Sequence, residues 1–101
     1  MIVSEITVKN LADYLKLDFE SLTEEEKAEL NVFLSSAKLF ISEYTGLNQE
    51  EIDTHETFVV AVYILVQDMY DNRSMYIDKN NMNKVVESVL GMHIGNNGGI
   101  G

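Results

Sequence analysis

The sequence contains no cysteine, which excludes disulfide bonds and chemistry at a thiolate. It also lacks a long apolar segment. The longest uninterrupted run, Phe58–Val66, has nine residues, about half of what a transmembrane helix needs. The first ten residues show no basic region followed by an apolar stretch and a small-residue cleavage site, so no secretory signal is expected. These absences predict a protein made in the cytoplasm that stays in solution and does not enter a membrane.

Positive charge is scarce. Seven lysine and arginine residues stand against 17 acidic residues, which gives a net charge of −10, and the seven cations form no cluster. Tight nucleic-acid binding requires a basic face that displaces counterions from phosphates, so specific DNA binding is not expected. The acidic charge is also uneven, because residues 1–56 carry a net −9 and residues 57–101 only −1.

The spacing of apolar residues predicts an all-α fold, and the first half of the chain contains two of its helices. Thr7 is expected to cap a helix that runs to about Leu17. Thr23 and Glu26 form a capping box at the start of a longer helix. Apolar residues follow it at steps of three and four, and Gly46 is suited to the left-handed turn that ends it.

The second half contains two further predicted helices. The third runs from Asp53, in a capping box with Glu56, to about Asp71; it is apolar on every face over Phe58–Val66, so it should be central and surrounded. The fourth ends at Gly91. Its apolar residues are expected on one face: Met82, Val85, Val86, Val89 and Leu90.

These segments predict a small four-helix bundle in a single domain, residues 1–94, followed by a flexible glycine-rich tail, residues 95–101. The predicted core is built on Leu30, Phe33, Leu34, Ala37, Ile41, Val59, Val62, Tyr63, Leu65, Val66 and Val86.

No residue pattern for catalysis, a cofactor or a metal emerges. His55-Glu56 would need a second histidine at position 59 to form a zinc-protease motif, and that residue is valine. The other histidine, His93, is near the C-terminus, and both are expected to be solvated. Residues 78–87 resemble a calcium loop only at their first and third positions, and a polar turn that caps the fourth helix explains them better.

Glu20-Ser21-Leu22 is similar to the Asp-Ser-Leu of acyl carrier proteins, in which the serine bears phosphopantetheine. Acyl carrier proteins are also small, acidic and helical. Here, however, glutamate replaces the aspartate, and Thr23 is the better candidate for the helix cap. A loop before a helix is the simpler interpretation, and a carrier function remains a minor alternative.

Three short motifs, in this order, resemble the head–tail connector (adaptor) family of long-tailed bacteriophages and prophages. Leu15-x-Leu17-Asp18 follows the first helix, Tyr44-Thr45-Gly46 ends the second, and Tyr70-Asp71-Asn72-Arg73 ends the third. The resemblance spans about residues 6–90. The chain departs from the family pattern in having no proline before the third helix and Met69 in place of a tryptophan.

The resemblance implies a structural virion protein at the head–tail junction, made in the bacterial host. Family members form a homo-oligomeric ring beneath the portal protein, extend the DNA conduit and dock the tail or the next adaptor. They are not enzymes and bind no cofactor. An acidic chain fits such a conduit, because DNA must pass through without being held. An acidic DNA mimic that inhibits a basic protein partner is the alternative function.

The end of the third helix provides the candidate interface residues, Tyr70, Asn72 and Arg73. An arginine near a helix C-terminus interacts favourably with the helix dipole, and asparagine tolerates a left-handed turn. Arg73, however, is the only arginine beside six lysines, and its planar guanidinium binds carboxylates through two hydrogen bonds. We therefore expect Arg73 to pair with a carboxylate of a neighbouring subunit or the portal, with Tyr70 packed beside it.

Overall fold

The computed structural model describes residues 1–74, 77 and 81–92, and all secondary structure in these residues is helical, which confirms the all-α prediction. The predicted tail, residues 95–101, lies outside them. The helices whose two ends both lie in these residues are, in order along the chain, η1 (Val3–Glu5), α1 (Val8–Tyr14), η2 (Phe19–Ser21), α2 (Glu24–Thr45), α3 (Gln49–Ile52), α4 (Phe58–Asn72) and α5 (Lys84–Gly91), where η marks a short 3₁₀ helix.

The longest helix, α2, begins and ends at the predicted residues. The hydroxyl oxygen of Thr23 accepts a hydrogen bond from the Glu26 backbone N–H at 3.0 Å, and the Glu26 carboxylate accepts one from the Thr23 N–H at 2.8 Å. At the other end, Gly46 has a φ of 77° and donates to the Ser42 carbonyl. A residue with a side chain is disfavoured in this left-handed conformation, so glycine is the most favourable residue there.

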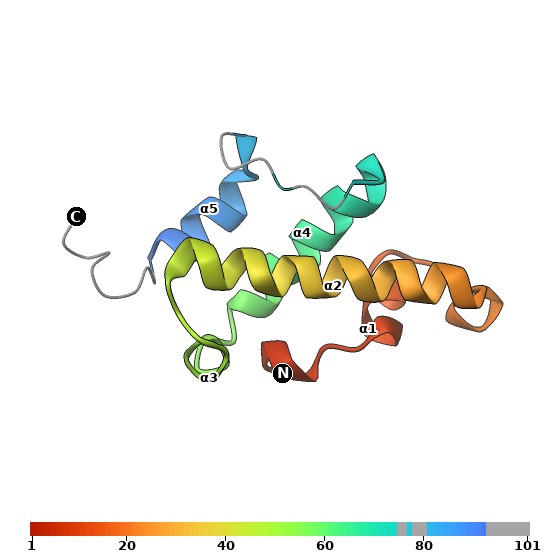
Figure 1. The fold of residues 1–101 in the computed structure, drawn as a ribbon, viewed down its shortest axis with the longest axis horizontal. Helices are drawn as coiled ribbons and strands as arrows, with labels where there is room; N and C mark the ends of the chain where they lie inside the picture. Colours follow the sequence, from red (N-terminus) through yellow and green to blue (C-terminus); the bar gives the residue numbers. More distant parts are fainter. Residues whose placement is uncertain (75–76, 78–80, 93–101) are drawn as a thin grey trace.

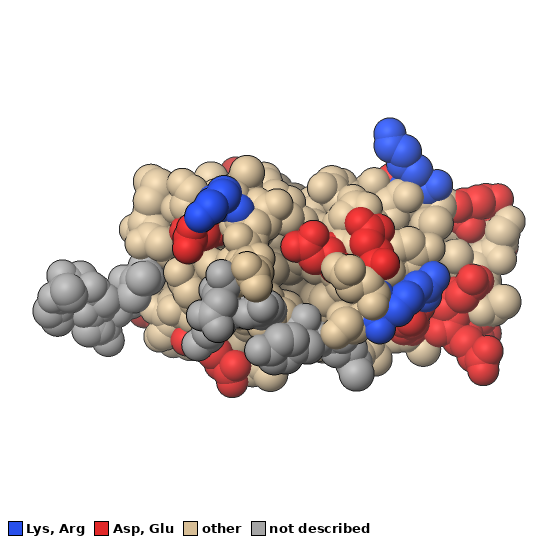
Figure 2. Space-filling view, turned by 90° about the horizontal axis from the view of Figure 1, so that it is seen from above, with Lys and Arg blue, Asp and Glu red and all other residues tan. Residues whose placement is uncertain are grey.

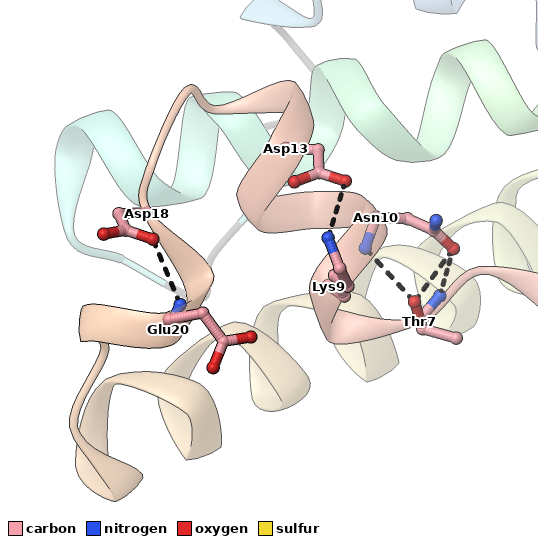
Figure 3. Close-up of polar contacts among 6 residues, drawn as sticks. All are labelled: Thr7, Lys9, Asn10, Asp13, Asp18 and Glu20. Atoms are coloured by element: carbon pink, nitrogen blue, oxygen red, sulfur yellow. Dashed lines mark hydrogen bonds and ion pairs between the residues drawn. The ribbon is translucent and has the colours of Figure 1, made fainter.

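The start of α1 is also as predicted, with Thr7 as the cap (Figure 3). Its hydroxyl accepts from the Asn10 N–H at 3.1 Å, and the Asn10 side-chain oxygen accepts from the Thr7 N–H at 2.8 Å. One turn further, Lys9 and Asp13 form an ion pair of 3.4 Å. Leu15 caps the end of the helix, and Lys16, the next residue, has a φ of 60°.

The predicted start of the third helix at Asp53 is wrong, because the chain forms two helices there. Asn48 and Glu51 form a capping box for the one-turn helix α3, and α4 begins only at Phe58. Asp53 ends α3 instead of capping α4. Its carboxylate accepts from the Ser4 backbone N–H at 3.0 Å and from the Ser4 hydroxyl, which ties α3 to the N-terminal η1.

The core forms where α2 crosses α4, with α1 and α5 packed against this pair (Figure 1). Nine of the eleven predicted core residues are buried, whereas Val59 and Tyr63 are only half-buried. Further buried residues, which the predicted core did not include, come from the N-terminal segment, from each of the five α-helices and from the turn before α5: Val3, Ile6, Leu11, Ala12, Phe40, Ile52, Phe58, Ala61, Met69, Met82 and Leu90.

Helices α4 and α5 are less completely covered than expected. Val86 and Leu90 of α5 are buried, but Val85, which was expected on the same face, is 50% exposed. On α4, Val60 is 48% exposed, so the prediction that this helix is surrounded on every face is wrong. The helices α1, η1, α2 and α5 contact α4, and these contacts leave the side that carries Val60 exposed.

Candidate interaction surface

The C-terminal end of α4 brings the three predicted interface residues together. Asn72 is the last helical residue, and its side-chain amide donates to the Asp68 carbonyl at 2.8 Å. Arg73 follows it in the left-handed conformation, with φ 49° and ψ 47°, and donates its backbone N–H back into the helix. Arginine, not asparagine as expected, therefore occupies the left-handed position.

The guanidinium of Arg73 has two contacts within the chain. Its Nη1 atom lies 2.5 Å from the Glu29 carboxylate of α2, and its Cζ atom lies 4.5 Å from the centre of the Tyr70 ring. The Arg73 side chain is still 58% exposed. The contact with Glu29 therefore holds the guanidinium over Tyr70 and leaves part of it open to solvent. Pairing with a neighbouring subunit stays a prediction.

A cleft of about 400 Å³ lies between the last turns of α4 and the start of α5. Asp68 is the titratable group among its described lining residues. Asp68 is exposed, but the partial burial of its carboxyl group raises its pKa above the usual value, and the negative charge of Asp71 raises it further. The other described lining residues are amides, hydroxyls and apolar side chains: Leu65, Met69, Asn72, Ser74, Ile77, Asn81, Met82 and Asn83.

Acidic side chains gather at the end of the molecule where α2 begins (Figure 2). Glu24, Glu25 and Glu26 occupy the first turn of α2, and Glu20 lies in the preceding η2. Carboxylates near a helix N-terminus stabilise the helix through its dipole, which accounts for three of them. Such a surface repels phosphates and attracts cationic protein groups.

The residues considered for chemistry have structural contacts. Ser21 ends η2, and its hydroxyl donates to the Asp18 carboxylate at 2.8 Å, while Thr23 caps the following helix. His55 was expected to be solvated, but it is half-buried with its ring 4.9 Å from that of Phe58. Asn83 caps α5 by accepting from the Val85 N–H at 2.7 Å, as the polar-turn interpretation predicts. His93 and the first residues of the calcium-like stretch lie outside the described residues.

Within the part of the chain that the structure describes, no group of three or more potential metal ligands comes together, and no helix is both long and apolar enough to cross a membrane. Comparison of the chain with protein-family models, curated proteins and solved structures finds no match.

Proposed function

We propose that this chain is a head–tail connector of a tailed bacteriophage or prophage. In this role it assembles as a homo-oligomeric ring beneath the portal protein, extends the channel through which DNA passes, and docks the tail or the next adaptor. It is a structural protein of the virion, without catalytic activity or a cofactor. Its four longer helices act as one bundle.

The observation that carries the proposal is the order of three motifs at helix ends. Leu15-x-Leu17-Asp18 follows α1, Tyr44-Thr45-Gly46 ends α2, and Tyr70-Asp71-Asn72-Arg73 ends α4. Turns and exposed polar contacts occur at the ends of the helices in a bundle. Members of a family that assemble in the same way are therefore expected to share residues at helix ends. This order in a small all-helical chain resembles the connector family.

The charge of the chain supports the same role. A ring around moving DNA must not hold its phosphates, and a net charge of −10 with few cations meets that requirement. Acidic charge also improves solubility, so it supports the proposal only together with the helix-end motifs.

The second candidate function is that of a DNA mimic, and the acidic end of the molecule favours it (Figure 2). Glutamates around the start of α2 could occupy the phosphate-binding surface of a basic protein. Such an inhibitor would act as a single chain or a dimer and would compete with DNA. An acyl carrier function is less well supported, because Ser21 does not begin a helix.

Antibody labelling of virions tests the connector proposal. Particles purified from a culture that produces the phage should carry this chain, with label at the vertex where head and tail meet. Absence from the particles would contradict the proposal. Recovery of the chain in a complex with a basic protein that DNA displaces would favour the mimic, and a phosphopantetheine mass increment on Ser21 would favour the carrier.

A further inference from the structure

The cleft between the last turns of α4 and the start of α5 combines an apolar floor with a polar mouth. Among its described lining residues, those that are buried are all apolar: Leu65, Met69 and Met82. Those that are exposed are all polar: Asp68, Asn72, Asn81 and Asn83. The volume of the cleft, about 400 Å³, lies within the range of ligand pockets, about 300–1,000 Å³. A group that is apolar at one end and polar at the other therefore fits it.

Negative charge is concentrated where α4 meets this cleft. Asp68 and Asp71 lie one turn apart near the end of α4, so they repel each other, and the negative end of the helix dipole opposes both. The last turn of α4 contains no basic residue, and the guanidinium of Arg73, which follows it, pairs with Glu29 of α2. None of the ion pairs among the described residues includes either aspartate.

Asp68 therefore destabilises the isolated chain. Partial burial raises the pKa of its carboxyl group, and the charge of Asp71 raises it further, so the charged form is less favourable in the folded than in the unfolded chain. A residue that lowers stability and lines a cleft is expected where function requires it. A cation in the cleft would neutralise this carboxylate and remove the penalty.

The charges and hydrogen-bonding groups of the cleft favour a cation on an apolar stem. The two aspartates disfavour an anion, and the Val85 and Val86 N–H groups at the start of α5 already donate to the Asn83 side chain, at 2.7 and 3.4 Å. A metal ion gains nothing from the apolar floor, and no group of three or more potential ligands comes together in the described part of the chain. The charged group of lysine or arginine only donates hydrogen bonds, and its alkyl stem packs against apolar surface.

We infer that this cleft receives a lysine or arginine side chain of a different protein, with the charged group at Asp68 and the alkyl stem on the apolar floor. The inference rests on the proposed function for the identity of that protein, which is then the portal or the next adaptor. A second copy of this chain is a poor source of the side chain. It has only seven cations, and four already form ion pairs within the chain: Lys9, Lys27, Arg73 and Lys84.

Nuclear magnetic resonance titration of the isotope-labelled chain tests the chemistry of the cleft. The probe is acetyl-lysine methylamide, and its matched control is acetyl-norleucine methylamide, which has the same alkyl stem without the ammonium group. The lysine probe should shift the signals of Asp68, Asn72 and Asn83. The norleucine control should bind at least about fivefold more weakly, which is the loss expected for one exposed ion pair. Equal binding of the two would overturn the inference.

Substitutions locate the site. Asp68→Asn should weaken binding of the lysine probe at least about fivefold, and Asp68→Glu, which keeps the charge, should restore part of it. Glu25→Gln is the matched control, because it removes one charge at the acidic end of the molecule, and it should leave binding unchanged. Because Asp68→Asn also stabilises the chain at pH 7, weaker binding by this variant cannot result from unfolding. An equal loss in Glu25→Gln would mean that the net negative charge attracts the probe, which would contradict a specific site.

Lys79 is the basic residue of this chain that lies nearest in the sequence to the cleft residues, and it is outside the described part of the structure. Lys79→Gln tests whether the chain supplies its own cation. The inference predicts unchanged binding of the lysine probe. An increase in affinity of about tenfold or more would mean that the cleft is already occupied by Lys79, and would overturn the inference.

A second experiment tests the partner. In a phage that carries Asp68→Asn in its genome, the amount of this chain in purified particles should fall at least about fivefold, whereas Glu25→Gln should leave it unchanged. Normal incorporation of Asp68→Asn would contradict a docking role for the cleft and leave the connector proposal intact. Absence of the natural chain from particles would contradict the connector proposal. Charge-specific binding of the lysine probe would then still support the cleft as a site for another basic protein.

Discussion

Arg73 and Glu29 join the end of α4 to the first half of α2, with the guanidinium Nη1 atom 2.5 Å from the carboxylate. The two residues are 44 positions apart in the chain. Because α2 and α4 form the centre of the fold, this pair adds a surface contact to their packing at the acidic end of the molecule. It also gives Arg73 a partner inside the chain, so its proposed contact with another subunit must add to this pair or replace it.

Substitutions of Arg73 and Glu29 separate these two roles. Exposed ion pairs contribute about 1 kcal/mol or less to the free energy of unfolding, so Arg73→Lys and Arg73→Ala should change the melting of the single chain little. Both should weaken ring formation or portal docking if the guanidinium also binds a neighbouring carboxylate.

Glu29→Gln is the matched control, because it removes the internal pair and keeps Arg73. If it weakens assembly as much as Arg73→Ala does, Arg73 acts only by positioning within the chain. If Arg73→Lys assembles like the natural protein, the guanidinium has no specific role at the interface.

Two of the left-handed positions, Gly46 and Lys16, should respond in opposite ways to the presence of glycine. Gly46→Ala should lower the free energy of unfolding by about 1 kcal/mol, because alanine is strained at φ 77° although no atom lies within 4 Å of the added carbon. Lys16→Gly at φ 60° should raise it by several tenths of a kcal/mol to about 1 kcal/mol.

Urea unfolding of each variant measures both effects. Lys16→Ala distinguishes backbone strain from loss of the lysine side chain, because alanine keeps the strain. Equal stability of the glycine and alanine variants at position 16 would contradict the argument from strain.

Phe33 and Val32 are neighbours with opposite environments, and they test the burial pattern of α2. Phe33→Ala removes a buried ring and should lower the free energy of unfolding by about 3–5 kcal/mol, enough to unfold much of a domain of this size. Val32→Ala, at an exposed position, should change it by less than about 0.5 kcal/mol in the single chain. Circular dichroism during urea unfolding compares them, and similar losses for both variants would mean that α2 is rotated from the position described.

The stability of the folded chain should depend on pH through Asp68. Its pKa is raised by burial and by Asp71, so the charged form is less favourable in the folded than in the unfolded chain. At a pH above the raised pKa, this charge lowers the free energy of unfolding by its full amount. The destabilisation decreases as the pH falls through the raised pKa, and it is absent below 3.8, the pKa of the carboxyl group in the unfolded chain. Asp68→Asn should therefore raise the melting temperature at pH 7 and have little effect at pH 3. Asp71→Asn should raise the melting temperature less at pH 7. If Asp68→Asn changed the melting temperature equally at pH 7 and pH 3, the raised pKa of Asp68 would be contradicted.

Local signals were sufficient to predict most helix ends. The Thr23–Glu26 box and Gly46 identified α2 because all of the interactions that end this helix are made by residues close in the sequence. The start of α4 was not predictable in this way. Asp53 and Glu56 have the spacing of a capping box, but Ser4, 49 residues away, binds the Asp53 carboxylate.

The candidate surfaces were also predictable from the sequence only in part. The sequence identified Tyr70, Asn72 and Arg73 as one site because they are adjacent at a helix end, but it could not identify Glu29 as the partner of Arg73, since that contact depends on how α2 and α4 pack. The absence of charge over residues 58–67 was visible in the sequence and was interpreted as complete burial. Only the packing of the other helices revealed that one side of α4 is exposed.

The oligomeric mass of the purified chain as a function of salt concentration tests the ring most directly. Each subunit carries a net charge of −10, so repulsion opposes assembly at low ionic strength, whereas near 1 M salt the screening length falls to about 3 Å. Light scattering at high protein concentration should show the single chain at low salt and a closed oligomer of one defined mass at high salt. A single chain at every salt and protein concentration would contradict an intrinsic ring. Oligomers that dissociate as salt rises would mean that ion pairs hold the subunits together.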